Sequence, residues 1–117
     1  MRIGAAQIPV TTNVEDNLKN ILEACDWAVK NKLDYLLTPE CALSGYDTMS
    51  WNLNTCGPTE QAMEKLKEYS KNTGLGLAIG TLWIYDKDKQ GTGFGNGIHR
   101  NQLTFIQKGE IIGYVAK

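Results

Sequence analysis

Hydrophobic positions after residue 13 recur with the period of an α-helix. They are Val14, Leu18, Ile21, Leu22, Cys25, Ala28 and Val29. This spacing predicts a helix of about four turns with one buried stripe. Thr12 and Glu15 have the spacing of a capping box at its start, and we expect Asn31 to end it in a left-handed conformation.

A second helical pattern follows Gly57-Pro58, a suitable beginning because proline is tolerated in the first turn of a helix. Its buried stripe consists of Ala62, Met63, Leu66 and Tyr69. Gly74 is expected to end this helix, since glycine readily adopts the left-handed conformation that helix ends require.

Five stretches have the pattern of β-strands. They are Arg2–Val10, Asp34–Thr38, Leu75–Tyr85, Ile98–Gln107 and Ile111–Lys117. Lys108-Gly109 is predicted to be a hairpin turn, and Asp86–Gly97 a surface loop. The order β-α-β-α-β-β-β predicts an α/β fold, with one mixed sheet of about five strands and two helices on one face.

The composition fits a single globular domain of 117 residues, with 42% apolar residues, 21% charged residues and a net charge of -1. This balance gives no electrostatic reason to bind nucleic acid or an anionic membrane, and no apolar run is long enough to span a membrane. The three cysteines lack the paired spacing of a zinc site and fit a reduced, cytoplasmic protein.

Metal ions and cofactors are not expected. The loop Asp86–Gly97 begins like a calcium loop, but its twelfth position is a glycine instead of the bidentate glutamate. Its glycines also lack the spacing of a dinucleotide-binding loop. His99 is a lone histidine on a predicted strand.

Glu40 is the strongest candidate for chemistry. It follows the apolar run Leu36-Leu37 and Pro39, which cannot donate to a strand ladder, so Glu40 is placed at the carboxyl end of a strand. An acid leaving an apolar strand is expected to have a raised pKa and to suit general-base catalysis. The spacing alone fits a solvated loop glutamate equally well.

The chain resembles the carbon-nitrogen hydrolase (nitrilase/amidase) superfamily. The residues that carry this resemblance are, in order, Ala5-Ala6-Gln7-Ile8, Asn17-Leu18, Pro39-Glu40, Gly45-Tyr46, Asn96 and the strand Ile111–Lys117. The resemblance covers the whole chain but only about half of a family domain. It implies half of an α-β-β-α sandwich, and a substrate that is a small amide or nitrile.

Members of this superfamily use a Glu-Lys-Cys triad. The resemblance implies that Glu40 is the general base and that Lys117 stabilises the oxyanion, with the cysteine nucleophile downstream of the lysine. Residues 1–117 would then be the N-terminal part of the domain, truncated before the nucleophile and inactive alone. We also expect Lys117 to fray, because terminal residues are commonly disordered.

Tyr46 and Asn96 have two readings each, and Cys41 is not expected to replace the missing nucleophile. The resemblance implies that Tyr46 lines a substrate pocket, although an aromatic closing the core is equally compatible. Asn96 matches a family position, but a turn residue after Gly95 explains it equally well. Cys41 is expected to point away from Glu40, since neighbours on an extended chain face opposite sides, and to be a small buried hydrophobe.

A half sandwich predicts a sheet face without its cover. Apolar residues on both faces of Ile98–Gln107 and Ile111–Lys117 indicate a sheet that is covered on both sides. We therefore expect two copies to bury this face against each other as a homo-oligomer. The alternative function is accordingly a non-catalytic domain that binds itself or a related subunit.

Overall fold

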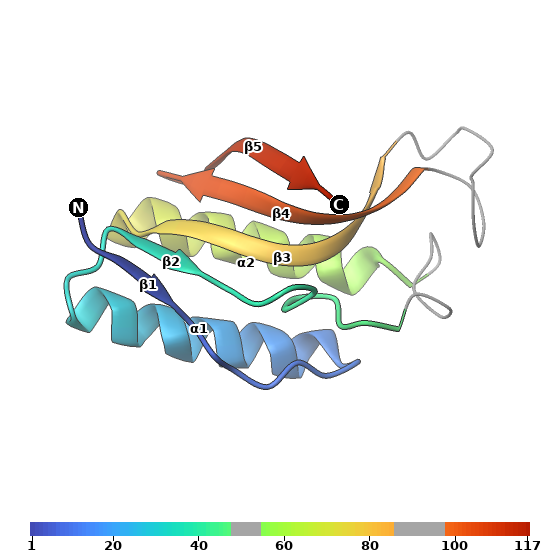
Figure 1. The fold of residues 1–117 in the computed structure, drawn as a ribbon, viewed down its shortest axis with the longest axis horizontal. Coiled ribbons are helices and arrows are strands. Elements are labelled where there is room, and N and C mark those ends of the chain that lie inside the picture. The colour runs from blue at the N-terminus through green and yellow to red at the C-terminus, as the bar shows by residue number, and fades with distance from the viewer. Residues whose placement is uncertain (48–54, 86–97) are drawn as a thin grey trace.

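The computed structural model describes residues 1–47, 55–85 and 98–117. Its elements are β1 (Ile3–Ala5), α1 (Val14–Lys30), β2 (Tyr35–Leu37), α2 (Gly57–Thr73), β3 (Gly76–Tyr85), β4 (Ile98–Gln107) and β5 (Glu110–Ala116). Within this part of the chain the strands form one sheet in the order β1-β2-β3-β4-β5. The first three strands are parallel and the last three antiparallel, so the predicted mixed α/β sheet is confirmed (Figure 1).

Both helices pack on the same face of this sheet, where the hydrophobic core lies. Ile21 and Cys25 of α1 and Leu66 of α2 are completely buried there. The sheet contributes fully or almost fully buried side chains to the same cluster: Leu36, Leu77, Ile79 and Ile106. The predicted apolar stripes of the two helices therefore face the core, except Val29, which is 40% exposed. No helix in the described segments is both long enough and apolar enough to cross a membrane.

The start of α1 differs from the predicted capping box of Thr12 and Glu15. Asn13 is the N-cap, and its side-chain oxygen accepts a hydrogen bond of 2.9 Å from the backbone N–H of Asp16. Asn13 has the extended backbone that an N-cap needs, and Asp16 lies three residues further on, where the N–H has no partner within the helix. Thr12 lies outside the helix.

A residue with a left-handed backbone conformation follows the C-terminal end of each helix. Gly74 ends α2 with φ of 79° and donates its N–H to the carbonyl of Ser70, as the sequence predicted. At the end of α1 the left-handed residue is Lys32, with φ of 58°, whereas Asn31 has φ of -92°. The prediction for Asn31 was wrong because its amide caps the carbonyl of Trp27 instead.

The first strand is much shorter than the predicted Arg2–Val10. Its partner β2 provides only three residues, and the Ala6 N–H to Leu37 carbonyl bond of 2.8 Å is the last between them. Beyond it, Ile8 and Val10 pack against the core without a strand partner. β1 is therefore short because β2, its only pairing partner among the described strands, is short. The local sequence pattern of β1 does not contain this information.

Within the described residues, the sheet face opposite the helices, here called the open face, is covered only beside β3, where Pro39 meets Gly80 and Cys41 packs in one cluster with Leu82 and Ile84. It carries Ile3, Leu37, Leu103, Phe105 and Val115, whose positions follow from the strand register. Ile3 is 66% exposed and Val115 is 63% exposed. The half-sandwich prediction thus matches the described residues, and the apolar face that it leaves is in contact with solvent.

The pairing of β4 with β5 contains a β-bulge. Phe105 pairs with Gly113, and the next residue, Ile106, pairs with Ile111, so Ile112 is an extra residue on β5. Beyond the bulge the register continues from Leu103–Val115 to Gln102–Ala116. The bulge increases the local twist and shifts which residues of β5 face each side.

Asn17 ties the beginning of α1 to the segment after β2. Its side chain is fully buried, and its Nδ2 donates to the carbonyls of Thr11 at 2.7 Å and Leu43 at 3.0 Å. Its Oδ1 accepts from the Thr11 N–H at 2.9 Å. One buried amide therefore satisfies three backbone groups in two loops.

Replacing Asn17 with alanine should destabilise the fold strongly. Asn17→Ala leaves buried backbone groups without partners, and we expect the free energy of unfolding to fall by about 2–4 kcal/mol. Urea denaturation followed by circular dichroism measures this change. Asn20→Ala, the same substitution at a less buried position on the same helix, is the control and should have a much smaller effect. Equal effects of both variants would contradict the role of Asn17.

Candidate functional site

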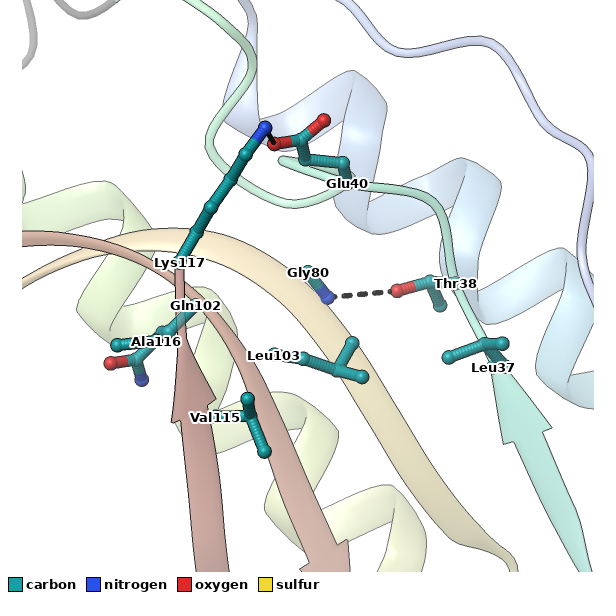
Figure 2. A pocket seen from close by; sticks show the side chains of 9 residues that line it. All are labelled: Leu37, Thr38, Glu40, Gly80, Gln102, Leu103, Val115, Ala116 and Lys117. Atoms are coloured by element: carbon teal, nitrogen blue, oxygen red, sulfur yellow. Dashed lines mark hydrogen bonds and ion pairs between the residues drawn. The ribbon is translucent and has the colours of Figure 1, made fainter.

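The segment after β2 lies directly against β3. The Thr38 hydroxyl donates to the carbonyl of Ala78 at 3.0 Å and accepts from the N–H of Gly80 at 3.0 Å (Figure 2). A Cβ atom at Gly80 would overlap with the carbonyl oxygen of Pro39. The absence of a side chain at Gly80 therefore allows the backbone of residue 39 to rest on the strand.

The far end of this segment is fastened to the same strand. The Leu43 N–H donates to the carbonyl of Gly80 at 3.0 Å, and the Leu82 N–H donates to the Ser44 hydroxyl at 2.8 Å. Gly45 follows with φ of 81°, and a Cβ there would overlap with the carbonyl oxygen of Thr11. Residues 40–44 thus form a turn whose two ends are fixed by hydrogen bonds.

A cavity of about 410 Å³ opens beside this turn on the open face (Figure 2). Its lining residues are Leu37, Thr38, Glu40, Gly80, Gln102, Leu103, Val115, Ala116 and Lys117. Figure 2 places the head groups of Glu40 and Lys117 together at one side, away from the apolar side chains of Leu103 and Val115. The charged pair therefore adjoins a largely apolar hollow.

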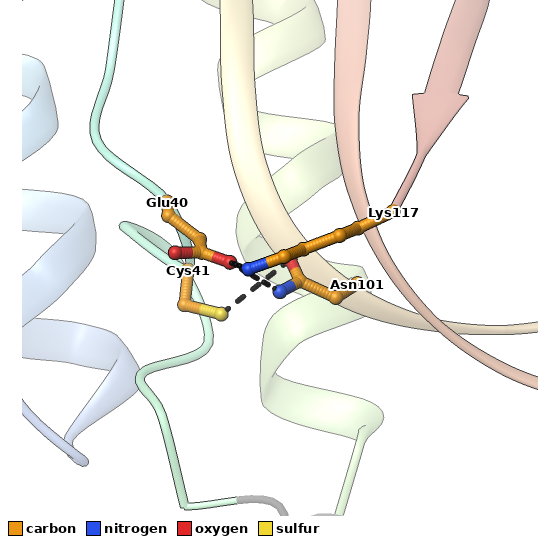
Figure 3. Close-up of polar contacts among 4 residues, drawn as sticks. All are labelled: Glu40, Cys41, Asn101 and Lys117. Carbon is orange, nitrogen blue, oxygen red and sulfur yellow. Dashed lines mark hydrogen bonds and ion pairs between the residues drawn. The ribbon is translucent and has the colours of Figure 1, made fainter.

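Glu40 meets two side chains from distant parts of the sequence. Its Oε1 accepts from the ammonium of Lys117 at 3.0 Å and from Nδ2 of Asn101 at 2.6 Å (Figure 3). The backbone N–H of Lys117 also donates to the carbonyl of Asn101 at 2.8 Å. The structure thus brings together the two residues for which the sequence predicted catalytic roles, with Asn101 in contact with both.

The electrostatics of Glu40 differ from the prediction. Hydrogen bonds from Lys117 and Asn101, together with the positive charge of Lys117, lower the pKa of Glu40 from its ordinary value. The same contact raises the pKa of Lys117. The predicted rise in the Glu40 pKa was wrong because the side chain, 43% exposed, leaves the apolar strand and accepts two donors.

Lys117 makes two hydrogen bonds to the site, and its expected fraying stays a prediction. Its backbone N–H and its ammonium are both hydrogen-bonded, to Asn101 and Glu40 respectively. The lysine side chain is nevertheless 76% exposed, so the ion pair is open to water. An exposed pair of this kind contributes little to stability and is weakened by salt.

Cys41 does not point away from the site as predicted. Its backbone has φ of 54°, and its Sγ lies 3.7 Å from Oδ1 of Asn101. The alternation of an extended chain fails because Cys41 belongs to the turn at residues 40–44. Burial and the neighbouring charge of Glu40 raise the pKa of this thiol, while Lys117 acts in the opposite direction. The predicted burial of Cys41 is confirmed.

Tyr46 does not line the cavity, and Asn96 is not among the described residues. Tyr46 is 55% exposed and is not among the residues that line the cavity, so it does not close the core. Its role in a substrate pocket stays a prediction. Asn96 and the loop Asp86–Gly97 lie outside the described residues. Among the described residues no group of three or more His, Cys, Asp or Glu could hold a metal ion.

Asn101 is the site residue that the sequence analysis missed. A signal was available, because Asn101 is a polar residue near the start of a predicted strand that pairs with the preceding strand. An antiparallel partner begins where the preceding strand ends, so Asn101 lies near the carboxyl ends of β2 and β3. Its pairing with Leu82 places it at the same edge as Glu40.

The comparisons with known proteins show the family and the fold. The family model described as carbon-nitrogen hydrolase matches residues 2–117. Nitrilase homolog 2 of Dictyostelium discoideum is 27% identical over 111 residues, which are 95% of this chain and 32% of that protein. The chain thus spans about a third of the length of this curated relative.

Solved structures have the same fold. A glutamine-dependent NAD(+) synthetase from Cytophaga hutchinsonii is 25% identical with a TM-score of 0.76, covering 100% of this chain and 19% of that one. An amidase from Nesterenkonia sp. has a TM-score of 0.76 at 18% identity, covering 100% of this chain and 42% of that one. At such identities the amidase supports the fold alone.

The contact between Glu40 and Lys117 should be visible in an acid titration. The folded pKa of Glu40 is lowered, so its ionised form stabilises the fold above the unfolded pKa, and this contribution is lost as the pH falls through the folded pKa. In Lys117→Met the pKa of Glu40 should rise toward the ordinary value. ¹³C NMR of the glutamate carboxyls measures it. Lys65→Met, on the exposed side of α2, should leave it unchanged, and an unchanged curve in Lys117→Met would contradict the ion pair.

Proposed function

The chain belongs to the carbon-nitrogen hydrolase family, and on this premise we propose that it carries two groups of an active site that cleaves non-peptide carbon-nitrogen bonds. Glu40 is the general base, and Lys117 stabilises the oxyanion. The substrate class is a small amide or nitrile. The observation that carries the proposal is the 3.0 Å contact between these two side chains beside a largely apolar cavity.

Glu40 can serve both halves of an amide hydrolysis. Its carboxylate takes the proton of a cysteine thiol as the sulfur attacks the carbonyl carbon, and then gives this proton to the departing amine. The acyl group remains on the sulfur. A water molecule next loses a proton to Glu40 while it attacks the acyl carbon, and the proton returns to the sulfur as the acid leaves.

Lys117 supplies positive charge where negative charge develops. When the sulfur or the water adds to the carbonyl carbon, the carbonyl oxygen becomes an anion that an ammonium stabilises. An ammonium has three donors, of which Glu40 uses one. The others are available to the oxyanion, and the raised pKa of Lys117 keeps it cationic.

The nucleophile in this proposal is not Cys41. Burial and the charge of Glu40 disfavour its thiolate, and its Sγ is turned toward Asn101. The chain covers 32% of Nitrilase homolog 2, and we place the nucleophilic cysteine in the remainder of a longer protein. Residues 1–117 are then the N-terminal part of a catalytic domain.

The rest of the longer protein would also cover the open face. Lys117 is 76% exposed here, and an ammonium in contact with water stabilises an oxyanion much less than one in a dry site. Covering the open face would remove water from the Glu40–Lys117 pair and from the exposed side chain of Val115. Catalysis and burial of the apolar face therefore require the same cover.

Release of ammonia from short aliphatic amides tests the catalytic roles. In the longer protein, Glu40→Gln and Lys117→Met should each lower kcat/KM by about 10²–10⁴-fold, because each removes a transition-state interaction. Glu64→Gln, on the exposed side of α2, is the control and should retain activity. Full activity of Glu40→Gln would contradict the general-base role. Glu40-dependent turnover by residues 1–117 alone would contradict the external nucleophile.

A second candidate function is a non-catalytic domain that self-associates, favoured by the exposed apolar side chains of the open face. Analytical ultracentrifugation at micromolar concentration tests it. Self-association through this face predicts a dimer that Val115→Lys dissociates, whereas Val29→Lys on α1 leaves it intact. A well-folded monomer would contradict this alternative, and so would a dimer indifferent to Val115→Lys.

A further inference from the structure

The two donors to Glu40 converge on one of its two oxygens. Nδ2 of Asn101 and the ammonium of Lys117 both donate to Oε1, at 2.6 Å and 3.0 Å. In Figure 3 the other oxygen is directed away from both donors. Among the residues that the structure describes, no hydrogen bond reaches Oε2. The carboxylate is therefore anchored asymmetrically.

This asymmetry decides which oxygen can take a proton. An ionised carboxylate oxygen has two lone-pair sites, and two donors occupy those of Oε1. A third hydrogen would have to displace Asn101 or Lys117. Oε2 retains both of its lone pairs, so protonation there leaves the existing contacts of Glu40 in place.

Asn101 holds both partners of the pair at once. Its side chain donates to Glu40, and its backbone carbonyl accepts the N–H of Lys117 at 2.8 Å. Lys117 must also serve the oxyanion in the proposed reaction, whereas Asn101 has no such second task. The bond from Asn101 is thus the one that can hold Glu40 in the same position through every step.

The thiol of Cys41 and the carboxylate of Glu40 both favour the direction in which the Asn101 amide faces. The Sγ–H donates to Oδ1, and this contact turns Nδ2 toward Glu40. In the flipped amide Oδ1 would face the carboxylate, and two acceptors would meet without a hydrogen between them. The left-handed backbone of Cys41 brings its sulfur to this side of the turn.

We infer that Asn101 is a positioning residue that anchors Oε1 of Glu40, so that Oε2 is the atom that accepts the proton, and that the Cys41 thiol orients the Asn101 amide. The inference rests on the proposed role of Glu40. In the first step the thiol S–H bond of the nucleophile breaks, the proton goes to Oε2, and the sulfur electron pair forms the bond to carbon. Oε1 keeps its donors throughout.

NMR of the uniformly labelled 117-residue chain tests the anchor without any turnover. The titratable groups around Glu40 are Lys117, directly after β5, Cys41 in the turn and, near Lys117, Tyr46. The side-chain amide protons of Asn101 should shift with the ionisation of Glu40. This response should vanish in Glu40→Gln, and the Glu40 titration should move toward the ordinary glutamate value in Asn101→Ala.

Variants of Cys41 test the orientation of the amide. Cys41→Ser keeps a donor and should preserve the coupled titration, whereas Cys41→Ala should weaken it by allowing the amide to flip. Asn72→Ala on α2 is the control for the loss of an asparagine. Unfolding midpoints by circular dichroism identify any variant with a disturbed fold. An Asn101 amide indifferent to Glu40, or a Glu40 titration unchanged in Asn101→Ala, would overturn the inference.

Turnover by the longer protein separates this inference from the proposed function. Asn101→Ala should lower kcat by about 10–100-fold with little change in KM, because the base is misplaced but present. The acidic limb of its pH–kcat profile should move upward with the Glu40 pKa. Unchanged kcat in Asn101→Ala would refute positioning. If Glu40→Gln retains activity, the proposed function fails even where the NMR coupling is found.

Discussion

The site depends on how closely Pro39 and the turn at residues 40–44 lie against β3. Gly80 permits this approach, because any side chain there would occupy the position of the Pro39 carbonyl. Thr38 and Ser44 then fasten the two ends of the turn to the strand. With both ends fixed, the backbone of Glu40 has no freedom to move away from β4 and β5, where its partners are. Rigid placement of this kind is what a catalytic acid-base group requires.

The hydrogen bonds of the turn and the contacts of the site form one continuous arrangement. Asn17 of α1 donates a hydrogen bond to the carbonyl of Leu43, and Asn101 of β4 donates one to the carboxylate of Glu40. Amide side chains suit both tasks because each can donate and accept at once. The Glu40–Lys117 ion pair itself is exposed and contributes little to the stability of the fold. The hydrogen bonds that fix the turn therefore contribute more to stability than the ion pair does. The ion pair can then take part in a reaction without loss of the fold.

The elements of the fold followed from local patterns, whereas the site followed from contacts that local patterns do not contain. Helical periodicity and Gly74 predicted both helices well, and Glu40 was located by its place after an apolar strand. The direction of its pKa shift was wrong because its donors, Asn101 and Lys117, lie 61 and 77 residues away in the sequence. Cys41 was misplaced because one left-handed residue reverses the side of the chain on which a side chain lies.

The bulge at Ile112 determines which residues of β5 face each side of the sheet. In the observed register Asn101 lies on the same side of the sheet as Leu103 and Val115, and the next odd residue is Lys117. Had the same residues of β5 paired without the bulge, with Ile106 still opposite Ile111, Ala116 would stand opposite Asn101 and Lys117 would lie on the helix side of the sheet. The pairing of one hairpin residue thus determines on which side of the sheet a charge appears. A shift in register that removes the bulge would separate the ammonium from the carboxylate, whereas deletion of Ile112 itself would keep Lys117 opposite Asn101.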